Sequence, residues 1–352
     1  MSSLAEVARR AGVSKATASR ALSGAANVSP AARERVAAAA SDLGYVVSST
    51  AASLVTGRTK NVGVITPFIN RWFFAEVLEG IEGALIQAGY DLTLFRLPAE
   101  PEQRSRLFHY FLVRKRVDAI VCVGVALTPS EVELIHTLRR PAVGIGGAIP
   151  GITTMSIDDV QATRLATNHL LSLGHRRIVH IGGDLGEQMD FQVHARRLAG
   201  FRSAMDAAGV DERPGDFRPT EFSVPGGYEA ALAILADPAT RPTAIVAGCD
   251  EIAIGAITAA RQLGIVVPSE LSIVGIDDHP YSAMFGLTTV RQRPGEQGEQ
   301  AVDLIVRAMG ASEPSLESLA IDIPIGLEVR SSTTAPASLY PVSQPHGTMV
   351  SP

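Results

Sequence analysis

Residues 4–22 read LAEVARRAGVSKATASRAL, and the order of apolar, small and charged residues in this stretch decides the fold of the N-terminal region. The apolar positions recur at helical spacing, which predicts a helix with one inward stripe made of Leu4, Val7, Ala8 and Ala11. Ser3 and Glu6 form a capping box, so this helix has a defined start. Gly12 permits a tight turn, and Ser14 is a natural N-cap for a second helix.

The second helix turns small residues inward and polar residues outward. Ala18, Ala21 and Leu22 face the core, whereas the outward positions are Lys15, Ala16, Thr17, Ser19 and Arg20. Such a helix fits the major groove of DNA, because cations and hydroxyls hold phosphates while central side chains reach base edges. Ser29 and Pro30 open a third helix, and Gly44 closes it. Residues 1–46 therefore read as a helix-turn-helix DNA-binding domain, with a small helical bundle containing an incidental turn as the alternative.

The charge distribution favours DNA binding. Residues 1–60 hold eight Lys or Arg and three Asp or Glu, a net charge of +5. Because the whole chain carries −5, the other 292 residues carry −10. A basic head on an acidic body suits a module that must bind phosphates while the rest of the chain avoids them.

The sequence closely resembles the lactose-repressor/galactose-repressor family of bacterial transcription regulators. The head matches LxxVARxAGVSxxTxSRxL, VSxxxRxxVxxAxxxLGY and AxSLxTGRT, in that order. Further matches are VGVITPFINRWFFAEVLEGIE, SLGHRRIVHIGG, ARRLAGFRSAM, ELSIVGIDDHPYSAMFGLTTVRQ and GLEVRSST. The resemblance covers about residues 3–333 and is specific, because many independent motifs agree.

This resemblance implies roles for residues of the head and of the hinge. Lys15, Ala16 and Arg20 match base-reading positions, and Thr17 and Ser19 match phosphate contacts. Residues 47–60 would be a hinge helix and linker, in which Leu54 matches the leucine that wedges into the minor groove and kinks the duplex. Packing of Leu54 against its dimer mate is the alternative. The hinge departs from the family pattern at Val47, Ser48 and Ala52, where Pro, Asn and Arg are common.

From Val62 onward, apolar strand-like runs alternate with helix-like runs. The strand-like runs are Val62–Thr66, Leu92–Phe95, Ala119–Val123, Ala142–Ile145, Ile178–Ile181, Ala244–Ala247 and Leu271–Ile276. The helix-like runs include Phe74–Ala88, Thr163–Leu173, Ala195–Ala208, Tyr228–Leu235 and Ile252–Leu263. This alternation predicts an α/β fold with parallel sheets flanked by helices.

The family fold implies a two-lobed, periplasmic-binding-protein-like body of doubly wound parallel sheets over residues 61–333. Three crossovers would join the lobes, and the chain would return to the first lobe near Leu287 to Gln292. Residues 334–352 are rich in Pro and Ser and are expected to be a disordered tail. The chain shows no secretory signal and no run of 18 apolar residues, and Cys122 and Cys249 lack CxxC spacing, which favours a cytoplasmic protein with reduced thiols and no membrane span.

Ligands of open α/β sheets bind beyond the carboxyl ends of the strands, in the cleft between lobes. The candidates in such places are Trp72, Phe73, Asp158, Arg197, Phe222, Asp250, Asp277 and Gln292. Carboxylates and an arginine can hold sugar hydroxyls, and Trp72 could stack on a sugar face. Alternatives remain for each type of residue: an inter-lobe salt bridge for Arg197, a structural turn for Asp277, and core packing for Trp72 and Phe222.

We therefore expect a dimeric repressor of carbohydrate genes that binds a pseudo-palindromic operator and responds to a small sugar. A purine co-repressor is the alternative effector. A solute-binding protein would require a signal peptide and no basic head. An enzyme is disfavoured because HExxH, GxSxG and P-loop motifs are absent, and no cofactor or metal site is expected.

Overall fold

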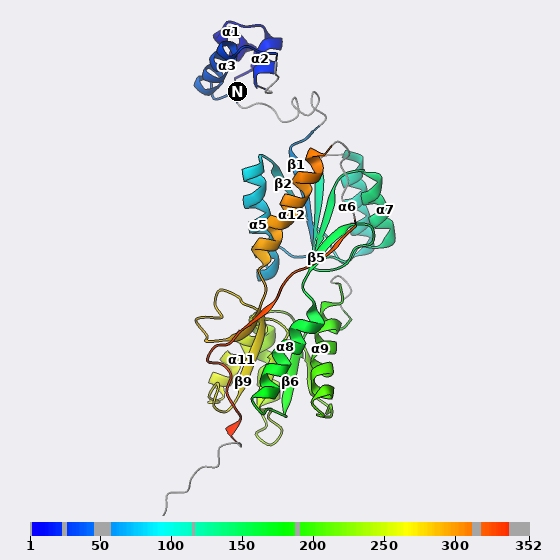
Figure 1. Cartoon of the computed structure of the whole chain (residues 1–352), viewed down its shortest axis with the longest axis vertical. Helices are drawn as coiled ribbons and strands as arrows, with labels where there is room; N and C mark the ends of the chain where they lie inside the picture. The colour runs from blue at the N-terminus through cyan, green and yellow to red at the C-terminus, as the bar shows by residue number, and fades with distance from the viewer. Residues whose placement is uncertain are drawn as a thin grey trace, which may run out of the picture.

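The computed structural model describes residues 2–22, 27–45, 58–114, 117–186, 191–311 and 318–337, with the side chains of 110–114 excepted. Figure 1 shows a three-helix head followed by two α/β lobes. Residues 47–57 of the predicted hinge helix and linker, which include Leu54, Val47, Ser48 and Ala52, lie outside the described residues, as does the tail from residue 338 onward.

The head consists of α1 (Leu4–Ala11), α2 (Lys15–Leu22) and α3 (Pro30–Asp42). The predicted capping box is present: the Ser3 side chain accepts from the Glu6 amide, and the Glu6 carboxylate accepts from the Ser3 amide at 2.7 Å. Gly12 ends α1 with a φ of 65°, a left-handed conformation that glycine adopts without strain. The apolar faces of the three helices meet in a small core that includes Val7, Ala18 and Val36, each fully buried.

The first lobe is built on a parallel six-stranded sheet with the order β11-β5-β4-β3-β1-β2 among the described strands. Its strands are β1 (Asn61–Thr66), β2 (Asp91–Arg96), β3 (Ala119–Val123), β4 (Ala142–Ile145), β5 (Thr153–Ser156) and β11 (Ala320–Asp322). Its helices are α5 (Trp72–Ala88), α6 (Pro101–Arg114), α7 (Pro129–Thr137) and α12 (Pro294–Gly310). α5 and α12 share a hydrophobic core with one face of the sheet, whereas α6 and α7 cover the other face.

The second lobe repeats this plan with the strand order β12-β10-β9-β8-β6-β7. Its strands are β6 (Ile178–Gly182), β7 (Phe217–Pro219), β8 (Ala244–Ala247), β9 (Ser272–Asp277), β10 (Thr288–Arg291) and β12 (Gly326–Glu328). Its helices are α8 (Asp159–Ser172), α9 (Val193–Ala207), α10 (Val224–Leu235) and α11 (Asp250–Gln262). α8 and α9 cover one face of the sheet and α10 and α11 cover the other, so both faces are buried from solvent.

The chain passes between the lobes three times, after β5, after β10 and after β11. The return to the first lobe that was predicted near Leu287 to Gln292 begins at the end of that range, because Thr288–Arg291 forms β10 and pairs with β9. The crossing falls at Gln292 and Arg293, immediately before α12.

The C-terminal end of the described chain crosses both lobes. β11 joins the first sheet and β12 pairs antiparallel with β10 of the second. Thr334, which the sequence assigned to a disordered tail, is bound to this lobe: its amide donates to the Ser272 hydroxyl at 3.0 Å and its carbonyl lies 2.8 Å from His175 Nε2. Within the described ranges, no helix is long and apolar enough to cross a membrane.

Candidate functional site

The outer face of α2 presents the residues that the sequence selected for DNA contact. Lys15, Ala16 and Arg20 are exposed and Thr17 and Ser19 are half-buried, whereas Ala18 and Ala21 are buried. The start of α2 is fixed because the Ser14 hydroxyl accepts from the Thr17 amide at 3.0 Å. α2 therefore offers a cation at each end and small or hydroxyl side chains between them, the shape that a major groove accepts.

A second candidate site is a cavity between the two lobes. The first lobe contributes Phe68 and the start of α5, and the second contributes residues that follow β6, β8 and β9. The crossover into α12 supplies Gln292 and Gln297. The free space is about 110 Å³. An engineered cavity of roughly 150 Å³ accommodates a benzene ring, so this space suits a ligand of about one ring.

One end of the cavity is polar and centred on Arg197. Its Nε donates to Asp159 Oδ1 at 2.9 Å, and its Nη1 donates to the Gly248 carbonyl. Asp277 is buried beside this guanidinium and accepts from Gln292 Nε2 at 2.6 Å. Burial raises the pKa of Asp277 to about 7, although the charge of Arg197 acts in the opposite direction. Asp277 also has a φ of 128°, a strained backbone geometry of the kind that clusters at functional sites.

Five phenylalanine rings form much of the remaining wall of the cavity, namely Phe68, Phe73, Phe74, Phe191 and Phe222. Two glycines make room for them. A Cβ at Gly147 would lie 2.1 Å from the Phe191 ring, and one at Gly124 would lie 2.5 Å from the Phe74 ring. These walls offer flat apolar faces to a bound molecule, while its hydrogen bonds would form at the Arg197 end.

Five of the eight residues predicted for the effector line this cavity: Phe73, Arg197, Phe222, Asp277 and Gln292. Trp72 does not line it, because its indole packs instead against His279 of the other lobe, with ring centroids 4.8 Å apart. Asp158 does not line it either, since its side chain caps α8 by accepting from the amides of Val160 and Gln161.

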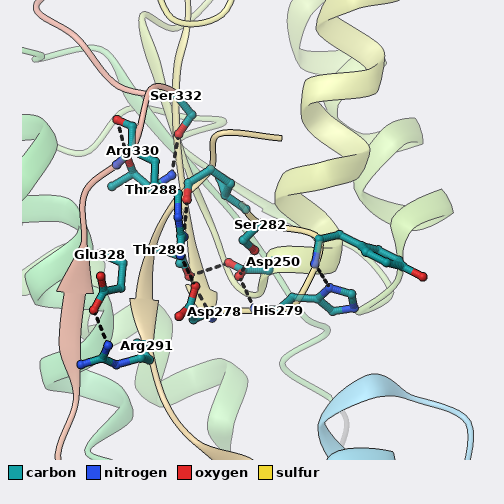
Figure 2. Close-up of polar contacts among 12 residues, drawn as sticks. Asp250, Asp278, His279, Ser282, Thr288, Thr289, Arg291, Glu328, Arg330 and Ser332 are labelled. Atoms are coloured by element: carbon teal, nitrogen blue, oxygen red, sulfur yellow. Dashed lines mark hydrogen bonds and ion pairs between the residues drawn. The ribbon is translucent and has the colours of Figure 1, made fainter. Parts of the chain in front are cut away.

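Asp250, the third predicted residue outside the cavity, is fully buried in a network of its own (Figure 2). Its carboxylate accepts from the Ser282 hydroxyl at 2.6 Å, the Thr289 hydroxyl at 2.7 Å and the His279 amide at 2.9 Å. Burial raises the pKa of Asp250 to about 6, and these three hydrogen bonds oppose the shift. Asp250 therefore holds the turn after β9 onto the start of α11.

Several lining residues were missed by the sequence reasoning, among them Arg71, Phe74, Asp159, Phe191 and Gln297. Arg71 is the chain neighbour of Trp72 and Asp159 is the chain neighbour of Asp158, both of which were predicted. The lining thiol of Cys249 is buried, which raises its pKa well above the ordinary value and keeps it neutral. Among the described residues, no group of three or more His, Cys, Asp or Glu is arranged to hold a metal ion.

Comparison with known proteins identifies relatives of this chain. Residues 3–48 match the bacterial regulatory proteins of the lacI family, and residues 167–333 match a periplasmic binding protein-like domain. Catabolite control protein A of Priestia megaterium is 32% identical over 333 residues, covering 93% of this chain and 98% of that protein. The ribose operon repressor of Escherichia coli K12 is 30% identical over 334 residues, covering 93% of this chain and 99% of that protein.

The solved structures agree with these relatives. The lac repressor dimer bound to operator and the anti-inducer ONPF superposes with a TM-score of 0.82 at 25% identity, over 95% of this chain and 99% of that one. The similarity of fold thus extends over nearly the whole length of both chains. The chain belongs to the lacI family of bacterial regulatory proteins.

Proposed function

We propose that this chain is a dimeric repressor whose binding to a pseudo-palindromic operator is controlled by a small sugar in the inter-lobe cavity. The observation that carries the proposal is the presence, on one chain, of a basic helix-turn-helix head and an inter-lobe cavity with a buried polar end. A regulator of this kind acts on DNA in the cytoplasm and needs no catalytic group.

The head supplies the contact with DNA. In this proposal Lys15, Ala16 and Arg20 reach base edges, and Thr17 and Ser19 bind phosphates. Their places on the outer side of α2 support these roles. Leu54 is assigned to the minor groove at the operator centre, where an apolar wedge would kink the duplex.

The cavity supplies the response. Arg197, Asp277 and Gln292 offer donors and acceptors for sugar hydroxyls at one end, and the phenylalanine rings offer faces for the C–H side of a pyranose or furanose. The same rings could enclose a planar purine, which keeps a purine co-repressor as the second candidate. In this proposal Trp72, Asp158 and Asp250 do not contact the sugar. They stabilise the protein around the cavity through a ring contact, a helix cap and buried hydrogen bonds, respectively.

Dimerisation is supported by apolar side chains that the second lobe leaves exposed. Val224 at the start of α10 is 36% exposed, and Tyr281 and Met284 in the turn after β9 are 57% and 80% exposed. Asp250 holds this turn through Ser282 and His279. A two-fold interface would cover these side chains and set the spacing of the two heads.

The test begins with the DNA that the full-length protein selects from a random-sequence pool. The selected duplex is then titrated with D-ribose, D-glucose, cellobiose, guanine and hypoxanthine at fixed salt, because phosphate contacts make affinity salt-dependent. Release by one of the sugars supports a sugar-inducible repressor. Tighter binding with a purine supports the co-repressor alternative, and failure to select any DNA contradicts the proposal.

A further inference from the structure

Two helices of the first lobe connect the cavity with the point where the linker from the head enters the lobe. α5 begins at Trp72 and places Phe73 and Phe74 in the cavity wall, and α12 begins just after Gln292 and places Gln297 there. Each helix has 17 residues, a length of about 25 Å. Figure 1 shows α5 and α12 side by side.

The two helices are locked together by close backbone contact at glycines. A Cβ at Gly80 of α5 would lie 2.1 Å from the carbonyl oxygen of Gly295, and one at Gly298 of α12 would lie 2.4 Å from the carbonyl oxygen of Val77. Backbones this close leave no room for one helix to slide without moving the other, since packed interiors are not continuously deformable. A Cβ at Gly83, three residues beyond Gly80 in α5, would meet no atom within 4 Å, so this glycine plays no part in the contact.

Residues 58–60, the first described residues of the predicted linker, contact the far end of α12 and the segment just beyond α5. The carbonyl of Met309 in the last turn of α12 accepts from Arg58 Nη2 at 2.8 Å. A cation here is favoured because the last carbonyls of a helix lack intrahelical partners and carry partial negative charge. Just beyond α5, the Tyr90 ring lies under Lys60 Nζ at 4.3 Å, and the Asp91 amide donates to the Lys60 carbonyl at 2.8 Å.

The cavity end of α12 is tied to the second lobe by hydrogen bonds that a ligand would disturb. Gln292 Nε2 donates to Asp277 Oδ1 at 2.6 Å, and Gln297 Nε2 donates to Gln292 Oε1 at 3.3 Å. A molecule that bonds to Asp277 or Gln297 competes with these contacts and changes how the start of α12 meets the second lobe. Helix shifts in switching proteins are about 1–2 Å, enough to break a hydrogen bond of ordinary length at the opposite end.

We propose that α5 and α12 act as one rigid two-helix unit that relays the state of the cavity to the linker, with the Arg58–Met309 hydrogen bond as its output contact. This inference rests on the proposed function and names how that site is coupled to the head. Arg58 is a positioning residue: it touches neither the cavity nor, in this role, the operator.

The relay can be followed without knowing the effector, because Trp72 is the only tryptophan in the chain and stands at the cavity end of α5. Coupling between two binding sites is reciprocal, so DNA binding at the head must change the structure or dynamics at the cavity. The experiment measures Trp72 emission of the full-length protein as the selected duplex is added to saturation, at fixed pH and salt. DNA occupancy is followed separately by the anisotropy of a label on the duplex.

Arg58→Met keeps the aliphatic stem and removes the donor. Its matched control is Arg307→Met on α12, whose side chain is 80% exposed and pairs only at 3.9 Å with Asp303. We expect the wild type and Arg307→Met to change Trp72 emission on saturation with the duplex, and Arg58→Met to lose most of that change at equal occupancy. Equal changes in all three proteins, or no change in the saturated wild type, would overturn the relay.

The glycine contact is tested by a second matched pair in α5. Gly80→Ala should force the helices apart and uncouple Trp72 from the duplex, whereas Gly83→Ala should leave the response intact. Circular dichroism confirms that each variant is folded. A folded Gly80→Ala protein with the full Trp72 response would remove the helix pair from the relay.

Hydrogen exchange in the free protein separates this inference from the proposed function. Loss of the Arg58 bond should speed amide exchange in the last turn of α12 in Arg58→Met and not in Arg307→Met. If the wild type selects no DNA, the proposed function fails. Comparing amide exchange rates in the last turn of α12 then still decides whether the Arg58–Met309 hydrogen bond stabilises that turn. Equal exchange rates in Arg58→Met and Arg307→Met would contradict such a role.

Discussion

Replacement of Arg197 by alanine tests the buried polar end of the cavity most severely. The Arg197 side chain is 7% exposed and the Asp159 side chain 6%, and their ion pair is completed by a hydrogen bond from Arg197 to the Gly248 carbonyl. Arg197→Ala removes the cation and leaves a buried carboxylate and a carbonyl without their charged partner. It also removes the charge that lowers the pKa of Asp277, so that pKa should rise further.

The expected loss of stability follows from the burial of this pair. Breaking a buried ion pair by removing one partner costs about 3–5 kcal/mol. For a unit of 150–250 residues, 1 kcal/mol corresponds to about 2–4 °C in Tm. We therefore expect Arg197→Ala to lower the Tm of the second lobe by roughly 6–20 °C.

The neighbouring residue provides the control. The Arg196 side chain is 51% exposed and lies 3.6 Å from the exposed carboxylate of Asp158. Surface pairs of this type contribute about 0–1 kcal/mol, so Arg196→Ala should shift Tm by at most a few degrees. The assay is thermal unfolding followed by circular dichroism. The double variant Arg197→Ala/Asp159→Ala should have a higher Tm than Arg197→Ala, because it also removes the buried carboxylate that has lost its partner.

Function should change in parallel. Arg197→Ala should retain operator binding, since the head folds around its own core, but lose the response to the effector. A Tm within a few degrees of that of Arg196→Ala would refute the reasoning about the buried pair. A normal effector response would mean that the ligand binds elsewhere.

Four further predictions concern the head and the cavity. Ser14→Ala removes the cap of α2 and should cost about 1 kcal/mol of head stability by thermal unfolding; an unchanged midpoint would show that the cap contributes nothing. Arg20→Ala should weaken operator binding by about 1–3 kcal/mol and relax base preference at one position of the selected site, whereas unchanged selection would exclude it from base contact. Leu54→Ala should reduce operator affinity and leave binding of the sugar intact; equal operator affinity would remove the minor-groove wedge. Asp277→Asn should be more stable than the wild type at pH 8 and lose that advantage towards pH 4. The pKa of Asp277 is raised from 3.8 to about 7 in the folded protein, so the wild type alone loses stability as the pH rises between these two values. Denaturant unfolding of both proteins across this range would contradict the reasoning if the difference did not grow with pH.

The parts of the fold that could be predicted from the sequence depend on local signals. Ser3, Glu6, Gly12 and Ser14 act within one or two turns of their own positions, and the structure confirms each of them. The long apolar strands were also recognised, because strands buried on both faces read as continuous apolar runs. The helix-turn-helix head and the alternating lobes followed from these signals.

Five strands were not predicted from the sequence, because they are short and contain no continuous apolar run: β5, β7, β10, β11 and β12. β11 has three residues and pairs with β5, more than 160 positions earlier. β10 contains two buried threonines, Thr288 and Thr289, whose hydroxyls are satisfied by Arg330 and Asp250. Polar residues of this kind read as a loop until their partners are known.

The cavity was predicted in outline and missed in detail. Arg197, Phe222 and Asp277 were predicted to lie at the cleft, and they line the cavity. They come from α9, from the segment after β7 and from the last position of β9. The choice between Asp158 and Asp159 depends on one helix cap, which directs the first carboxylate to backbone amides and the second to Arg197. No local signal distinguishes these two neighbours.

Operator affinity measured with and without the effector, together with effector affinity measured with and without the operator, tests the central claim of an effector-controlled repressor. The two ratios must be equal, because coupling between binding sites is reciprocal. We expect a common factor of about 5–150, reduced towards one in Arg197→Ala. A sugar that binds the cavity tightly while both ratios stay at one would contradict effector control of DNA binding.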